Sequence, residues 1–156
     1  MNYNKQKGKR FEKKIATIIN EVFNINDIDI PETLKVNRYF SSGSADYETG
    51  DINFGILYKY FFNIIIECKK WNNITKKKST IKYLYKQYSK KHEGKTVWLI
   101  IEDRYGKPII ILPKNLSYVQ DISKKLDTVL DLNDDNLIAL DFKTFITAYK
   151  NYVVKE

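Results

Sequence analysis

The amino-acid sequence predicts a mixed α/β fold, in which a helix, strands, a second helix, further strands and helical additions follow one another. Apolar residues recur at helical spacing from about Gly8 to Phe23, which predicts an amphipathic helix. Three consecutive isoleucines predict a buried strand within Phe62–Trp71. Residues 103–106 carry a strong hairpin signal between two apolar runs, Thr96–Glu102 and Pro108–Leu112.

Shorter patterns predict the remaining elements. Gly50–Leu57 is expected to form a strand that pairs with Phe62–Trp71 through a turn near residues 58–60. Asp141 is placed to cap a final helix. That helix is expected to bury Phe142, Phe145, Ile146 and Tyr149. The other expected elements are helices at about Ser79–Lys91 and about Leu116–Leu130, and a strand at Leu137–Leu140.

Size and composition narrow the functional classes. The 156 residues suit one domain, with a core at about 7–115 and a C-terminal extension at about 116–156. A net charge of +8 favours an anionic partner such as nucleic acid, although a basic soluble protein is equally compatible. With only Cys68 and His92, the chain cannot form an internal disulfide or a typical zinc site.

The apolar runs are too short to span a bilayer, and the polar N-terminus lacks the apolar stretch of a signal peptide. We therefore expect a protein that is not secreted and does not associate with membranes. Its expected location is the cytoplasm of a bacterial, archaeal or virus-infected cell. We expect no small-molecule cofactor.

Two acidic residues, Asp51 and Glu67, and one lysine, Lys69, lie in the two segments that are expected to pair as strands. Glu67 and Lys69 project from the same face of their strand, because side chains alternate along it. Asp51 begins the preceding strand and can lie beside Glu67 if the strands pair. Neighbouring carboxylates need a cation between them, and Mg²⁺ and Mn²⁺ prefer such oxygen ligands. An ordinary ion pair at a strand end and a turn aspartate remain the alternatives.

A third acid, Glu12, lies in the first helix. At 100° per residue it falls roughly 100° from Phe11, inside the apolar arc, so it needs a partner there. Alternatively, it stabilises the helix start from solvent. Together, Glu12, Asp51 and Glu67 are the candidate metal ligands for Mg²⁺, for which Mn²⁺ could substitute. The metal would promote phosphodiester hydrolysis, with Lys69 positioning the attacking water.

The order of these groups, Glu12, then Gly50-Asp51-Ile52, then Glu67-Cys68-Lys69, resembles the core of PD-(D/E)xK nucleases. Lys7–Glu12 and Arg38–Ser44 resemble matching segments of archaeal-type Holliday junction resolvases and their phage relatives. The resemblance implies a restriction-endonuclease-like core and a homodimer that cuts four-way DNA junctions. It also implies that Ser44, or less well Ser42, assists catalysis.

The chain departs from that pattern at Gly50, where the family usually carries proline, and the match is loose at about 24–37 and 116–136. A dense basic segment follows the motif, with nine lysines and no acid from Lys69 to Lys91. Phosphate contacts or a solvated face would both explain it. The candidate DNA-binding residues are Arg10, Arg38, Ser42, Lys70, Lys76, Lys77, Lys78, Lys82 and Gln87.

Other interpretations remain open. The chain could be a different PD-(D/E)xK restriction or repair endonuclease that acts on duplex or flap DNA. It could also be a nucleic-acid-binding module without catalytic activity. Of the residues outside the motif, Cys68 is expected to be a small core residue, His92 a surface residue, and the acidic segment 127–141 to face away from DNA or contact another subunit.

Overall fold

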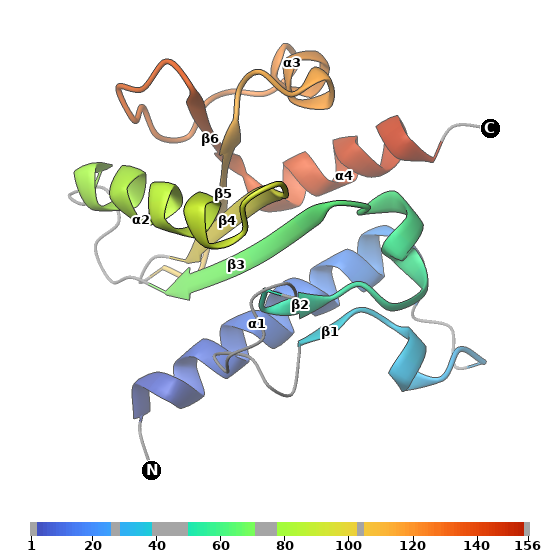
Figure 1. Ribbon diagram of the computed structural model, residues 1–156. Helices are drawn as coiled ribbons and strands as arrows, with labels where there is room; N and C mark the ends of the chain where they lie inside the picture. Colours follow the sequence, from blue (N-terminus) through green and yellow to red (C-terminus); the bar gives the residue numbers. More distant parts are fainter. Residues whose placement is uncertain (1–2, 26–28, 39–49, 71–77, 103–104, 155–156) are drawn as a thin grey trace.

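The computed structural model describes residues 3–25, 29–38, 50–70, 78–102 and 105–154, and Figure 1 traces their arrangement. Helices lie at α1 (Tyr3–Val22), α2 (Lys78–Lys91), α3 (Ser117–Ser123) and α4 (Phe142–Val153), with short 3-10 turns at η1 (Glu32–Leu34) and η2 (Gly55–Tyr60). Strands lie at β1 (Asn37–Arg38), β2 (Ile52–Asn53), β3 (Ile64–Lys70), β4 (Thr96–Glu102), β5 (Pro108–Pro113) and β6 (Leu137–Asp141). The predicted mixed α/β fold is confirmed.

A four-stranded mixed sheet in the order β3-β4-β5-β6 forms the centre of the molecule. β3 runs parallel to β4, with Glu67 opposite Leu99, and the other neighbouring pairs are antiparallel. A second, two-stranded sheet pairs β1 with β2. β3 is therefore at one edge of the main sheet, and the chain just before β2 lies along it.

Helices cover both faces of the main sheet, as Figure 1 shows, with α1 and α4 on one side and α2 on the other. Alternation along the strands explains this. Ile66 and Ile100 belong to the core shared with α1 and α4, whereas Leu99 and Ile101 belong to the core shared with α2. On β3 this places Glu67 and Lys69 on the α2 side.

The C-terminal helix forms as its sequence predicts. The Asp141 carboxylate accepts hydrogen bonds from the backbone amide of Thr144 at 3.0 Å and from the Thr144 hydroxyl at 2.7 Å. The four predicted apolar side chains of α4 are buried. None of the helices within the described ranges is both long and apolar enough to cross a membrane.

Two predicted elements are wrong in extent. The strand expected over Gly50–Leu57 is only Ile52–Asn53, because the chain turns at Gly55 (φ +58°) into η2. The helix expected to reach Leu130 ends at Ser123. Beyond it, the Val129 amide donates to the Ala139 carbonyl at 3.0 Å, so this part of the chain pairs with β6 instead of continuing the helix.

Candidate active site

Asp51 is fixed against the edge of β3 by two hydrogen bonds. Its amide donates to the Ile66 carbonyl at 2.9 Å, and its carboxylate oxygen Oδ2 accepts from the Cys68 amide at 2.8 Å. These two contacts flank Glu67 along the strand. The predicted side-by-side placement of Asp51 and Glu67 therefore arises through one anchored residue and not through a long hairpin.

Gly50 makes this close approach possible. Its φ is +63°, and a Cβ built on it would lie 2.5 Å from Ile65 Cγ2 and 2.8 Å from the Ile66 carbonyl oxygen. Proline cannot adopt this φ, since its ring fixes φ near −65°. The departure from the usual proline at this position is thus a structural requirement of this chain, because the backbone reaches β3 in the left-handed conformation that glycine tolerates.

Glu67 is a buried acid, with 4% of its surface exposed. Burial, followed by the negative charge of Asp51 and a hydrogen bond between the two carboxyl groups, raises the pKa of Glu67 from 4.5 to about 8. A carboxyl pair of this kind holds a proton unless a cation replaces it. The chemistry of these two donors therefore fits a divalent metal ion.

Lys69 is exposed at the end of β3, on the same sheet face as Glu67. Cys68 lies between them on the opposite face and packs against the core beneath α1, as expected. Burial, and then the charge of Asp51, raises the pKa of the Cys68 thiol well above its ordinary value. Cys68 is thus a neutral spacer, and its backbone amide is the part that contacts the site.

Glu12 is buried on α1, and its partner is Arg38. The Arg38 Nε lies 3.1 Å from Glu12 Oε2. Glu12 nonetheless belongs to the same electrostatic environment, because its charge contributes to raising the pKa of Glu67, although less than burial and Asp51 do. Two structural roles thus coexist for Glu12, an ion pair with Arg38 and a long-range influence on the carboxyl pair.

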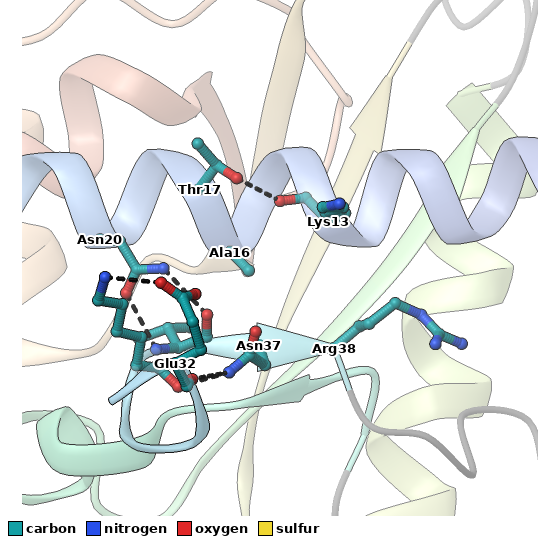
Figure 2. Close-up of a pocket in the computed structure, with 9 residues that line it drawn as sticks. Lys13, Ala16, Thr17, Asn20, Glu32, Asn37 and Arg38 are labelled. Carbon is teal, nitrogen blue, oxygen red and sulfur yellow. Dashed lines mark hydrogen bonds and ion pairs between the residues drawn. The ribbon is translucent and has the colours of Figure 1, made fainter. Parts of the chain in front are cut away.

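The side chain of Asn20 places Arg38 near Glu12. Asn20 Nδ2 donates to the Val36 carbonyl at 3.0 Å, and the Val36 amide donates to Asn20 Oδ1 at 2.9 Å, which ties the segment before β1 to α1. A cavity of about 330 Å³ lies between these segments, with both polar and apolar lining. Figure 2 shows Asn20 and Glu32 at one end of it, with the Arg38 side chain extending away from that end.

His92 and Lys91 contact Glu67, which the sequence did not indicate. His92 Nε2 lies 2.7 Å from Glu67 Oε1, and Lys91 Nζ lies 3.9 Å from the same oxygen. The expectation that His92 is a surface residue is wrong, since it is 4% exposed. The sequence indicates Lys91 only as one of the basic residues between Lys69 and Lys91. Burial, and then the charge of Glu67, also raises the pKa of Tyr88 well above its ordinary value.

The candidate DNA-binding residues fall into three groups. Arg10 on α1 is exposed, Lys78 and Lys82 lie half-buried on α2, and the exposed Gln87 donates to the Tyr83 hydroxyl at 3.0 Å. Arg38 and Lys70 carry ion pairs, to Glu12 and Glu102 respectively. Ser42, Lys76 and Lys77 lie outside the described residues, as does Ser44, the predicted catalytic serine.

Lys70 shares its partner with α1. The buried Glu102 accepts from Lys70 at 2.9 Å and from Lys14 at 2.8 Å. Burial alone would raise the pKa of Glu102, but the two lysine hydrogen bonds outweigh it and hold that pKa below 4.5. The Lys14–Glu102–Lys70 contact therefore joins α1 to the ends of β3 and β4.

Within the described ranges, no three His, Cys, Asp or Glu side chains gather closely enough to enclose a metal ion by themselves. Of the three predicted ligands, Asp51 and Glu67 are the two whose carboxyl groups are hydrogen-bonded to each other. This is compatible with Mg²⁺, which commonly keeps several waters and binds through one or two carboxylates together with substrate phosphates.

Residues 3–155 match the family model described as "Phage putative PDDEXK endonuclease". No curated protein and no solved structure matched the chain. The mixed sheet flanked by helices is consistent with a restriction-endonuclease-like fold. Because the match spans nearly the whole sequence, the chain belongs to this PDDEXK family.

Proposed function

We propose that this protein is a metal-dependent DNA endonuclease. Its active site, formed by Asp51, Glu67 and Lys69, hydrolyses phosphodiester bonds. One observation carries the proposal. Asp51 is bonded to the backbone of β3 on either side of Glu67, and the proximity of the two carboxyl groups contributes to raising the Glu67 pKa to about 8. A carboxyl pair of the half-buried Asp51 and the buried Glu67, with the exposed Lys69 on the same strand face, suits a site that takes up a divalent cation and an anionic substrate.

Each side chain has a separate task in this proposal. Asp51 and Glu67 hold the cation, with Mg²⁺ as the natural ion and Mn²⁺ as a substitute. When bound, the cation supplies Lewis-acid polarisation of the phosphoryl group and stabilises the leaving oxygen. Lys69 presents its ammonium on the Glu67 side of the sheet, where it orients the attacking water and offsets developing negative charge. Ser44 is proposed to assist in this step.

Glu12 serves the site through Arg38 and through its charge. Their ion pair holds Arg38 at the side of α1, and Arg38 pairs with Ile52, the residue after Asp51, between β1 and β2. We propose that Arg38 contacts a DNA phosphate from this position. Since Glu12 Oε2 is engaged with Arg38, a direct contact between Glu12 and the metal would use its other oxygen or a bridging water.

The proposed substrate is branched DNA, with the four-way junction first. The resemblance of Lys7–Glu12 and Arg38–Ser44 to junction resolvases supports this. Paired cuts would require a homodimer, which we propose together with this substrate. The lysines of α2 provide further support, because Lys78, Lys82, Lys86 and Lys90 recur every four residues and form one stripe along the helix. Such a stripe contacts phosphates without reading base sequence.

The test is cleavage of labelled DNA in Mg²⁺ or Mn²⁺, with EDTA as control. A four-way junction, a flap and a linear duplex should share the same arm sequences. We expect paired cuts in the junction and little cutting of the duplex. Equal cutting of all three would support a general duplex nuclease, and no cutting of any DNA with either ion would support a binding module. Sedimentation over a range of protein concentrations tests the homodimer.

A further inference from the structure

His92 occupies a fixed position immediately after α2. Its amide donates to the Tyr88 carbonyl at 2.9 Å, and its carbonyl accepts from the Lys95 amide at 3.0 Å. The backbone is therefore held on both sides of the residue by the helix end and the turn that follows. The imidazole is placed by the packing of α2 on the sheet, and it does not depend on a long loop for its position.

The imidazole and the neighbouring ammonium approach one oxygen of Glu67. His92 Nε2 lies 2.7 Å and Lys91 Nζ 3.9 Å from Oε1. Glu67 and His92 are both buried. A rotation of the Glu67 carboxyl group that broke its hydrogen bond with His92 would therefore cost free energy, because buried polar atoms would lose that partner. Lys91 at the end of α2 and the following His92 thus fix which way the Glu67 carboxyl group turns, with Oε2 as the oxygen that can serve a cation.

We propose that His92 is a positioning residue for the metal ligand Glu67, and that the Lys91–His92 pair couples the lysine-bearing helix α2 to the metal site. This inference rests on the proposed function, because it assigns Glu67 to the metal. Partners that orient a ligand in this way are generally important for affinity, since they fix the geometry before the metal arrives.

The wild-type protein allows a direct test, because His92 is its single histidine. In a sample without a histidine tag, long-range ¹H–¹⁵N spectra therefore report one imidazole without any assignment problem. We expect the His92 nitrogen signals to shift during a Mg²⁺ titration and to saturate with the dissociation constant that calorimetry gives. Signals that stay unchanged while calorimetry shows saturation would overturn the inference.

Two substitutions provide an independent measurement. His92→Gln retains an N–H donor at about the reach of Nε2, whereas His92→Leu has similar bulk and no donor. We expect His92→Leu to weaken Mn²⁺ binding by about 10- to 100-fold, and His92→Gln to change it by less than about threefold. Equal affinities of His92→Leu and the wild type would contradict the positioning role. Thermal melts without metal establish that each variant folds, and the wild-type spectra decide the question if His92→Leu does not.

Asp51→Asn distinguishes a failure of the proposed metal site from a failure of the role of His92. If the wild type binds neither Mg²⁺ nor Mn²⁺, the proposed function fails and the role of His92 fails with it. If the wild type binds and Asp51→Asn does not, the metal site stands. Unmoved imidazole signals in that case would refute the role of His92 alone.

Discussion

Replacing Gly50 with alanine tests whether the close approach of the chain to β3 builds the site. The new Cβ would lie 2.5 Å from Ile65 Cγ2 and 2.8 Å from the Ile66 carbonyl oxygen, and φ is +63°. The left-handed backbone costs about 1–2 kcal/mol for a residue with a Cβ. Forcing extra volume into a packed region costs about 1–3 kcal/mol more. We therefore expect Gly50→Ala to lower the free energy of unfolding by roughly 2–5 kcal/mol.

Gly94 provides a matched control, because its φ is +87° and a Cβ there would meet no atom within 4 Å. Gly94→Ala should incur the backbone cost alone, so the two variants should differ by about 1–3 kcal/mol. Urea unfolding followed by circular dichroism measures both values. Gly50→Ala should also weaken Mn²⁺ binding, since the displaced Ile66 carbonyl is the acceptor for the Asp51 amide. Equal destabilisation of the two variants, with unchanged metal affinity, would refute this reasoning.

Two further predictions concern charge. The raised Glu67 pKa means that the folded, metal-free protein keeps a proton that the unfolded chain releases above about pH 4.5, so stability should fall as pH rises from about 4.5 to 8. Urea midpoints across this range should show the fall in the wild type, and its persistence in Glu67→Gln would argue against the assignment. On α2, exchanging Lys82 and Lys86 for glutamine should reduce the slope of log affinity for DNA against log salt by about 2. The same exchange at Lys124 and Lys125, near α3, should leave that slope unchanged, and equal effects in the two pairs would argue against α2 as the DNA surface.

The elements that sequence predicts well are those with strong local signals. β4 has the predicted limits because its apolar run is continuous, and α4 begins where Asp141 can cap it. The strand expected after Gly50 is short for a reason that lies elsewhere in the chain. A Cβ at Gly55 would lie 2.2 Å from the Leu34 carbonyl oxygen, so this turn is shaped by η1, which the local pattern does not reveal.

Part of the site was predictable because it, too, depends on local sequence signals. Strand alternation places Glu67 and Lys69 on one face, and the position of Asp51 before its strand indicated a neighbouring carboxylate. The contact between His92 and Glu67 depends instead on how α2 packs on the sheet, over a separation of 25 residues. Periodicity describes the buried face of α2 but not the placement of the residue that follows it.

The most direct test of the central claim is the behaviour of Asp51→Asn. Its side-chain oxygen can still accept from the Cys68 amide, so the variant should fold, but it removes one negative charge from the proposed metal site. Binding of a four-way junction without divalent ions should stay within about threefold of wild type. Cleavage in Mg²⁺ should fall by at least about a hundredfold, because even residues that only orient a metal ligand are worth 10- to 100-fold. Wild-type cleavage by Asp51→Asn would contradict the account.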